Sequence, residues 1–350
     1  MKTDSRATLL AAATGLAAAL LTFDLLVWLY GEAPRTILSE LLSGTWGTAY
    51  GAGQVLFKAT PLLFTGLAVD VGLRAGLFNI GAEGQLVAAS LVAGVLGSRL
   101  PSGVPGFVAV PLVTFAAFVA GGAWATVPAV LRARFGAHEV ISTIMMNRIA
   151  DALVGAAFVY GFAQAGTVRT PDVVPGARFP RLDVLLPAFK GSAASFAFVL
   201  AVLSAALGVW AMKRTRAGRE IGLVGLNPVA CAAERVSVAK RLTQALVLSG
   251  AIAGLAATGT VLGYKGYYEA GLGAGAGFGG LAVALLGRGS AIGLVLAALF
   301  FGTLQQGGLA INGRVPMEVM DILQGVVIVA VALADVRIRA ALVAPLRTSS

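Results

Sequence analysis

Three polar side chains interrupt the apolar segment that begins at Gly76, and they are the first candidates for chemistry. The segment reads Gly-Leu-Phe-Asn-Ile-Gly-Ala-Glu-Gly-Gln and carries Asn79, Glu83 and Gln85. On one continuous helix, Asn79 and Glu83 share a face because they are four residues apart, whereas Gln85 lies well around it. A carboxylate at membrane depth costs roughly 3 kcal/mol, so it faces a cavity or a polar partner. Two interpretations stay open: these groups tie helices together, or they line the path of a solute.

A second polar group follows in the apolar segment that begins with Glu139-Val-Ile-Ser-Thr-Ile-Met-Met-Asn. It ends in Asn147 and Arg148, with Asp151 three residues further on. Arg148 and Asp151 are close enough on a helix to pair, which would reduce the cost of burying either charge. We therefore interpret these two as a structural pair and Asn147 as the candidate for a solute path.

Several kinds of site are missing from the sequence. There is no Gly-x-x-x-x-Gly-Lys-Ser/Thr run, so the chain has no P-loop for ATP. Cys231 is the only cysteine and His138 the only histidine, which excludes an internal disulfide and argues against zinc binding or histidine catalysis. No dense set of Asp, Glu and His suggests a proton relay. We expect a protein that is not an enzyme and holds no metal or cofactor, so energy for transport would come from a separate subunit.

The segment 213–241 is strongly basic and lies between two long apolar stretches. Asn227 followed by Pro228 predicts a helix start, because Asn caps a helix and Pro suits its first position. Gly225 just before them is expected to supply a break or a close approach to a partner, because it has no Cβ. The segment also holds apolar side chains, at Ile221, Leu223, Val224 and Leu226. It is either a surface that another protein binds or a basic loop that only fixes topology.

The composition identifies the class of protein. The 350 residues are 58% hydrophobic and only 12% charged, with a mean hydropathy of +0.87, whereas soluble domains are about a quarter charged. The chain is therefore an integral membrane protein. Its net charge of +10 would suggest nucleic acid binding in a soluble chain. Here the basic residues flank apolar stretches, where they set orientation and contact anionic lipid, so no nucleic acid partner is expected.

The elements that must position these residues are membrane-spanning helices. A span needs about 20 apolar residues, and the chain divides into about ten such stretches, which predicts an all-α polytopic fold. The first resembles a signal peptide but is long enough to be retained as a span. The eighth is glycine-rich and is expected to be short or broken. The ten stretches are 7–30, 53–73, 78–98, 105–131, 140–163, 194–212, 241–263, 271–287, 290–311 and 317–335.

The basic residues predict the orientation of these spans. With the N-terminus inside, sixteen Lys and Arg fall on the cytoplasmic side and eight on the other, while Lys58 and Arg148 lie within spans. This bias favours two cytoplasmic termini and a cytoplasmic 213–241 segment. The longest outer loop, 164–192, holds four prolines, which argue against a regular helix there. That loop is a solvated connector or a docking site for an external partner.

Four motifs in this order resemble the permease subunits of ABC importers in the branched-chain amino acid, simple-sugar and nucleoside group. The resemblance runs from about residue 55 to residue 335 and is closest to the nucleoside and simple-sugar branch. The motifs are Gly76–Gln85, Glu139–Asn147, Gly225-Leu-Asn-Pro-Val-Ala, and Gly277–Gly287 with Phe301-Gly302.

The resemblance implies partners and roles. It implies a permease dimer with a second copy or a paralogue, two cytoplasmic ATPase subunits that hold Mg-ATP, and an external solute-binding protein. It also assigns a set of residues to a short helix that docks in a cleft of the ATPase. They are Gly225, Leu226, Asn227, Pro228 and Ala230.

We therefore expect residues 1–350 to form one transmembrane permease domain in the cytoplasmic (inner) membrane of a bacterium. It would move a nucleoside or a simple sugar inward, along a path that includes Asn79, Glu83, Asn147 and Phe278. The alternative is a secondary transporter driven by an ion gradient, which would be active without an ATPase. A membrane enzyme is less favoured, because the chain lacks an acid–base or metal constellation.

Overall fold

The regular structure of the chain is helical. The computed structural model describes residue 17 and residues 20–343, with side chains as far as residue 330. Over this part there is no β-strand, only two isolated bridges, so the predicted all-α fold is confirmed. The principal helices are α2 (Pro34–Thr45), α3 (Ala49–Arg74), α4 (Ala82–Arg99), α5 (Gly106–Phe135), α6 (Glu139–Ala157), α7 (Ala197–Arg214), α8 (Arg216–Leu226), α9 (Pro228–Ala233), α10 (Val238–Gly254), α11 (Ala276–Gly287), α12 (Ala291–Ile311) and α13 (Glu318–Val343).

Six helical stretches of the described chain are long and apolar enough to cross a membrane. They begin and end within a few residues of six predicted spans, and they are Ala49–Arg74, Gly106–Phe135, Glu139–Phe162, Ala197–Arg214, Val238–Lys265 and Ala291–Ile311. The predicted spans 78–98 and 317–335 correspond to α4 and α13. The first predicted span, 7–30, lies partly outside the described residues. Within its described part, Leu20–Leu29 is helical.

The eighth predicted span is a short helix preceded by turns. Residues 270–275 form a turn with left-handed glycines, and α11 then has only 12 residues. At about 1.5 Å per residue, α11 is roughly 18 Å long, less than the ~30 Å of a bilayer core. A helix that begins inside the molecule has free backbone N–H groups at its start, and these must find acceptors.

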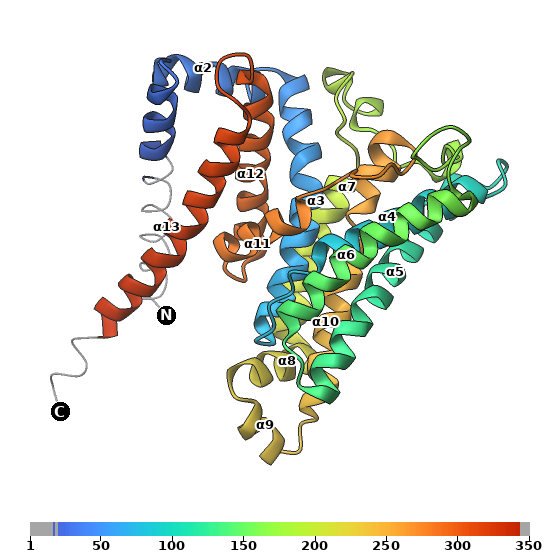
Figure 1. Cartoon of the computed structure of the whole chain (residues 1–350), viewed down its shortest axis with the longest axis vertical. Helices are drawn as coiled ribbons and strands as arrows, with labels where there is room; N and C mark the ends of the chain where they lie inside the picture. The colour runs from blue at the N-terminus through green and yellow to red at the C-terminus, as the bar shows by residue number, and fades with distance from the viewer. Residues whose placement is uncertain (1–16, 18–19, 344–350) are drawn as a thin grey trace.

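Helices α3 and α10 form the centre of the molecule. They belong to the two most buried of the six long helical stretches, Ala49–Arg74 and Val238–Lys265. The second stretch continues from α10 into the π-helix η5 (Thr258–Lys265). Figure 1 shows α4, α5 and α6 on one side of them and α2, α12 and α13 on the other. Since α3 packs against α7, α10, α11 and α12, it connects the two sides.

The two ends of the molecule carry different irregular elements. Helices α8 and α9 project from the end opposite to α2 (Figure 1). The loop 164–192 lies toward the other end and contains three short 3-10 turns, at Pro175–Ala177, Leu182–Val184 and Pro187–Phe189. The prediction that prolines prevent a regular helix in this loop is confirmed.

Candidate translocation path and coupling surface

Asn79 lies at the centre of a buried hydrogen-bond network at the start of α4. Its amide donates to Gln85 Oε1 at 2.9 Å and to Ser249 Oγ at 2.8 Å. Its oxygen accepts from Gly81 N at 3.0 Å and from Gln85 Nε2 at 3.1 Å. Ser249, on α10, donates in turn to the carbonyl oxygen of Ala68 on α3. All donors and acceptors of Asn79 are used, so this side chain joins α3, α4 and α10.

The helix-face argument for Asn79, Glu83 and Gln85 is wrong. Helix α4 begins at Ala82, so Asn79 lies in the turn before it and the helical spacing does not apply. The side chain of Asn79 instead folds over the turn and caps Gly81, a common use of Asn in turns. That geometry lets Gln85 reach Asn79, which a shared helix would not allow.

Glu83 fixes the start of α11. Its two carboxylate oxygens accept from the backbone N–H groups of Gly275 and Gly277, each at 2.7 Å. These are among the groups that the start of α11 leaves without intrahelical acceptors. A negative charge is also favourable at a helix N-terminus. The half-buried carboxylate of Glu83 therefore ties the first turn of α4 to the short helix α11.

Asn147 connects α6 to the same place. Its Oδ1 accepts from Gly84 N at 2.9 Å and its Nδ2 donates to the carbonyl oxygen of Ile80 at 3.1 Å. The structure thus brings Asn79, Glu83 and Asn147 together around the start of α4. Phe278 follows Gly277 on α11, but its ring is 54% exposed. Of the four predicted path residues, the two asparagines are buried and only Glu83 and Phe278 reach a surface.

The predicted pair on α6 is present but lies on the surface. Arg148 Nη1 and Asp151 Oδ2 are 3.9 Å apart, and both side chains are largely exposed. Such a pair contributes little to stability in water, and in lipid two such charges would be costly. This face of α6 is therefore suited to contact with water or another polypeptide.

Helices α8 and α9 form an apolar tip. Asn227 caps α9 through a 3.0 Å bond from Ala230 N to its Oδ1, with Pro228 at the first helical position. The predicted helix start is thus confirmed. The tip exposes Leu226 (83%) and Val229 (78%), with Pro228 and Ala230 also exposed. Cys231 on α9 is buried instead.

The expected break at Gly225 is wrong, because α8 continues through this residue to Leu226. Gly225 packs against the backbone at the end of α3: a Cβ there would overlap the carbonyl oxygen of Arg74 and lie 2.8 Å from Gly76 N. The residue without Cβ lets two backbones touch. Gly76 itself has a left-handed φ of 71° and begins the turn that leads to Asn79.

An ion-pair cluster holds α8 on the other helices. Glu220 accepts from Arg216 Nε at 2.7 Å and from Arg241 Nε at 2.7 Å, and Arg241 belongs to α10. The hydrogen bonds from Arg216 and Arg241 lower the pKa of the Glu220 carboxyl below its ordinary value. Because the charged form is favoured, the cluster persists at neutral pH and is lost only as acid protonates Glu220 below its unfolded-state pKa of about 4.3.

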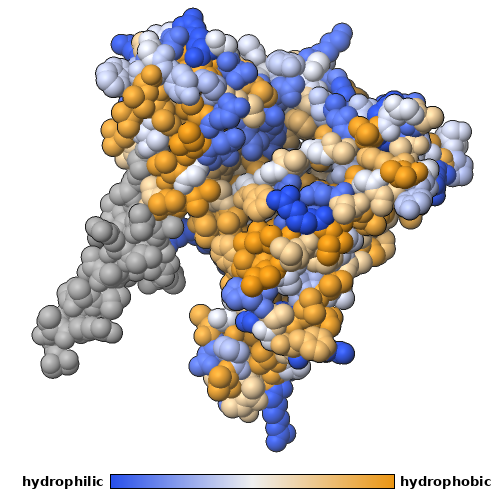
Figure 2. Space-filling model, viewed as in Figure 1, coloured by the Kyte–Doolittle hydropathy of each residue, from blue (hydrophilic) through white to orange (hydrophobic). Residues whose placement is uncertain are grey.

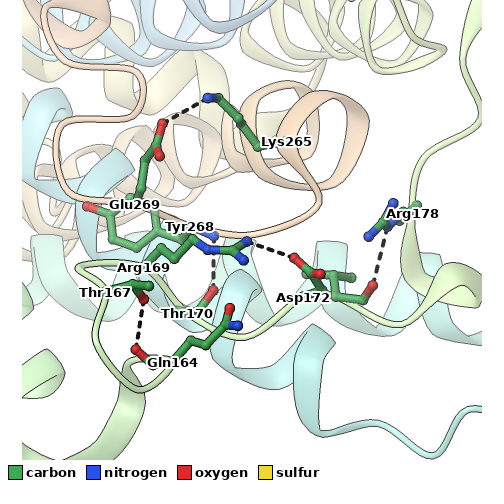
Figure 3. A network of polar contacts seen from close by, with 10 residues as sticks. Gln164, Thr167, Arg169, Thr170, Asp172, Arg178, Lys265, Tyr268 and Glu269 are labelled. Atoms are coloured by element: carbon green, nitrogen blue, oxygen red, sulfur yellow. Dashed lines mark hydrogen bonds and ion pairs between the residues drawn. The ribbon is translucent and has the colours of Figure 1, made fainter.

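Loop 164–192 is attached to the segment that follows η5. Thr170 N donates to the carbonyl oxygen of Tyr268 at 2.8 Å, and Tyr268 N donates to Thr170 Oγ1 at 3.0 Å. Figure 3 shows these contacts beside two ion pairs, Arg169 with Asp172 and Lys265 with Glu269. The loop is thus an ordered surface with charges of both signs.

Sequence reasoning missed some residues of the buried network. Ser249 was hidden in an apolar helix, where a lone serine gives no signal of its own. The backbone of Gly275 and Gly277, which binds Glu83, carries no side-chain signal at all. The glycine-rich composition before α11 was the only indication that backbone groups are available there.

The fold and these contacts define a class of protein, a multi-pass helical membrane protein with a polar junction inside and a short helical tip at one end. A family of branched-chain amino acid transport system permease components matches residues 51–332. The chain belongs to this family. It is a transport subunit of an ABC system, whose ATPase is a separate subunit and whose solutes are delivered by a solute-binding protein.

Individual relatives match most of the chain. It is 35% identical to the guanosine ABC transporter permease protein NupP of Bacillus subtilis, over 88% of each chain. It is 34% identical to the glucose ABC transporter permease protein TsgB13 of Haloferax volcanii, over 81% of this chain and 76% of that one. It is 30% identical to the nucleoside ABC transporter permease protein NupB of Lactococcus lactis, over 87% and 85%.

The same three organisms each hold a second, less similar ABC permease. These are 26–28% identical to this chain over 70–71% of its length. No solved structure matches the chain.

Proposed function

We propose that this chain carries a nucleoside or a simple sugar inward across the cytoplasmic membrane of a bacterium. The relatives named above are permeases for guanosine, glucose and nucleosides. These solutes are polar, carry several hydroxyl groups and have no net charge at neutral pH. The path would run beside Glu83 and Phe278, while Asn79 and Asn147 hold the helices that form it.

One observation carries the mechanism: the backbone contact between Gly225 and Arg74–Gly76. On one side of it lies the apolar tip, with Leu226, Asn227, Pro228 and Ala230 at the proposed ATPase contact. On the other side the chain runs directly from Gly76 to Asn79. A movement of the tip is therefore transmitted through packed backbone to the start of α4, where α3, α6, α10 and α11 meet.

The partners follow from this assignment. Two ATPase subunits would bind Mg-ATP and grip the tip, and a solute-binding protein would dock at the end that carries loop 164–192. A second permease would complete the path. A paralogue is favoured over an identical copy, because each of the three organisms has one permease of higher and one of lower similarity to this chain.

The proposed arrangement keeps ten spans with both termini and the 213–241 segment in the cytoplasm. The first of these spans requires the residues before Leu20. The exposed apolar faces of α5 and α7, with side chains such as Phe115 and Leu207, would contact lipid.

The test is reconstitution with candidate ATPase, second permease and binding protein from the same organism. ATP-dependent import of guanosine and of D-glucose is measured in proteoliposomes. Leu226→Asp and Val229→Asp place a charge on the exposed tip, where burial in an ATPase cleft would be costly. Each should reduce import and ATPase co-purification at least about tenfold, since such a charge costs several kcal/mol.

Leu186→Asp is the matched control. This leucine is exposed in the outer loop, at the other end of the molecule. It should leave ATPase binding unchanged. Import by the chain alone, driven by a proton or sodium gradient, would replace the ABC mechanism with the secondary transporter. Normal ATPase binding in both tip variants would reject the coupling surface.

A further inference from the structure

A polar cavity lies between α3, α12, η5 and the turn before α11. Its volume is about 310 Å³, within the range of small-molecule sites. It is lined by the side chains of Phe57, Lys58, Tyr264 and Gln305, among others, and by the backbone of the turn at 271–274. Another cavity, beside α5, is instead lined by Phe115, Phe118 and other mainly apolar side chains.

Three polar heads of this cavity have no partner among the described residues. They are the ammonium of Lys58, the amide of Gln305 and the hydroxyl of Tyr264. Lys58 is half-buried on a membrane-spanning helix. A lysine at membrane depth without a counter-ion is costly and marks a functional position.

The backbone adds acceptors to these donors. Pro61, which also lines the cavity, has no N–H, so the carbonyl of Phe57 loses its usual partner in α3. On the opposite wall, Gly271 and Gly273 adopt left-handed φ values of 83°. These angles suit only glycine well, and they bring bare backbone to the cavity.

The cavity lies on the side of the molecule where a solute would arrive. Lys58 is in the first half of α3, and Gln305 is in the last third of α12, toward the ends that lie away from α8 and α9 (Figure 1). Figure 2 shows the side of the molecule, with hydrophilic residues gathered toward this end, between the α12 side and the side of α4 and α6.

We propose that this cavity is an outer subsite for an uncharged solute rich in hydroxyl and carbonyl oxygens, with Lys58 as its principal donor. The inference rests on the proposed function and names a solute contact that the predicted path residues do not include. Acceptor oxygens of such a solute match the donors Lys58 and Tyr264. Its hydroxyl donors match the oxygen of Gln305 and the carbonyl of Phe57.

Charged solutes match the cavity less well. An anionic group offers only acceptors and would leave the Gln305 and Phe57 oxygens without donors. A cation would be repelled by the Lys58 ammonium at close range. The apolar walls, including the Phe57 and Tyr264 rings with centroids 4.6 Å apart, suit the carbon skeleton of a sugar or a base.

The experiment measures solute binding through protection of a thiol. Cys231→Ser removes the chain's single cysteine, and Ala274→Cys places a new one on the cavity wall. The complete transporter, in intact cells, is treated with a membrane-impermeant maleimide. Guanosine, D-glucose and, as the anionic comparison, D-glucuronate are added separately. Guanosine or glucose should slow labelling of Ala274→Cys.

Lys58→Met tests the donor directly. In the same background it should raise the protecting concentration of the neutral solute about tenfold, the loss expected for a hydrogen bond from a charged donor. Without the introduced cysteine, Lys58→Met should lower the rate of ATP-dependent import several-fold. Arg134→Met, which removes an exposed positive charge at the end of α5, is the matched control and should change neither quantity.

Each remaining outcome contradicts the inference. Absence of labelling at Ala274→Cys would show that the cavity does not open outward. Stronger protection by glucuronate would make it an anion site. Equal protection in Lys58→Met and Arg134→Met would remove Lys58 from the site. If the wild-type transporter imports neither neutral solute, the proposed function itself fails, which the import assay reports separately.

Discussion

Single polar side chains hold this molecule together where the backbone would otherwise lack partners. Asn79 satisfies the turn before α4, and Glu83 satisfies the first N–H groups of α11. Their residue types could be recognised in the sequence because amides and carboxylates are rare in apolar segments. Their partners could not, since Ser249 and Gly277 are distant in the chain and one contributes only its backbone.

Glu83 is the residue whose replacement separates attachment from charge. Glu83→Leu leaves the N–H groups of Gly275 and Gly277 without their carboxylate acceptor. The loss should cost about 1–3 kcal/mol at the buried Gly277 and less at the exposed Gly275, where water can replace the acceptor. Glu83→Gln keeps one acceptor oxygen and should cost about 1 kcal/mol through loss of the charge-assisted bonds. Thermal unfolding of the purified transporter and its import rate are measured together, and both should fall more in Glu83→Leu.

Glu318→Gln is the control for charge removal, because Glu318 is exposed at the start of α13. It should unfold as the wild type does. If Glu83→Leu is as stable as the wild type, the carboxylate does not hold α11. If Glu83→Gln is stable but does not transport, the negative charge itself belongs to the path.

At the scale of elements, the contact between α8 and the end of α3 depends on the absence of a side chain. The sequence predicted a special glycine at 225, as a break or as a close approach to a partner, and the structure shows a close approach to the backbone at the end of α3. Both uses of glycine leave the same letter in the sequence, and only the position of the partner backbone separates them. The start of α9 was predictable because Asn227 and Pro228 act locally.

Two glycines of α8 provide a matched comparison. A Cβ at Gly225 would overlap the Arg74 carbonyl oxygen, whereas a Cβ at Gly222 would meet no atom within 4 Å. Gly225→Ala should therefore displace α8 and reduce ATPase co-purification and ATP-dependent import. Gly222→Ala should leave both unchanged and should stabilise the helix by about 0.5–1 kcal/mol, the usual difference between the two residues.

The same measurements on both variants decide the matter. Thermal unfolding reports the packing of α8, and import per ATP hydrolysed reports coupling. Equal behaviour of Gly225→Ala and Gly222→Ala would mean that the backbone contact does not transmit movement. A loss confined to stability, with normal import per ATP, would make the contact structural only.

At the scale of the whole molecule, hydrophobic length and charge carry most of the predictable information. Six predicted spans coincide with long apolar helices, because the length and apolar composition of a span can be read from its own sequence without knowing its neighbours. Helix α11 was harder, because a 12-residue helix is stabilised by tertiary contacts such as Glu83 rather than by its own length. The cavity around Lys58 was beyond prediction, since three distant helical elements and a glycine turn form it.

The orientation of the molecule is the last prediction. The twofold excess of Lys and Arg on one side places α9 in the cytoplasm and loop 164–192 outside. Cys231 is buried, so in a Cys231→Ser background the exposed positions Val229→Cys and Lys190→Cys replace it as reporters. An impermeant maleimide should label Lys190→Cys in intact cells. It should label Val229→Cys only in inverted vesicles stripped of ATPase, because a bound ATPase would cover the tip. Labelling of Val229→Cys from outside would invert the topology. The tip would then lie outside the cell and the Lys58 cavity would face the cytoplasm, which contradicts the roles assigned to both.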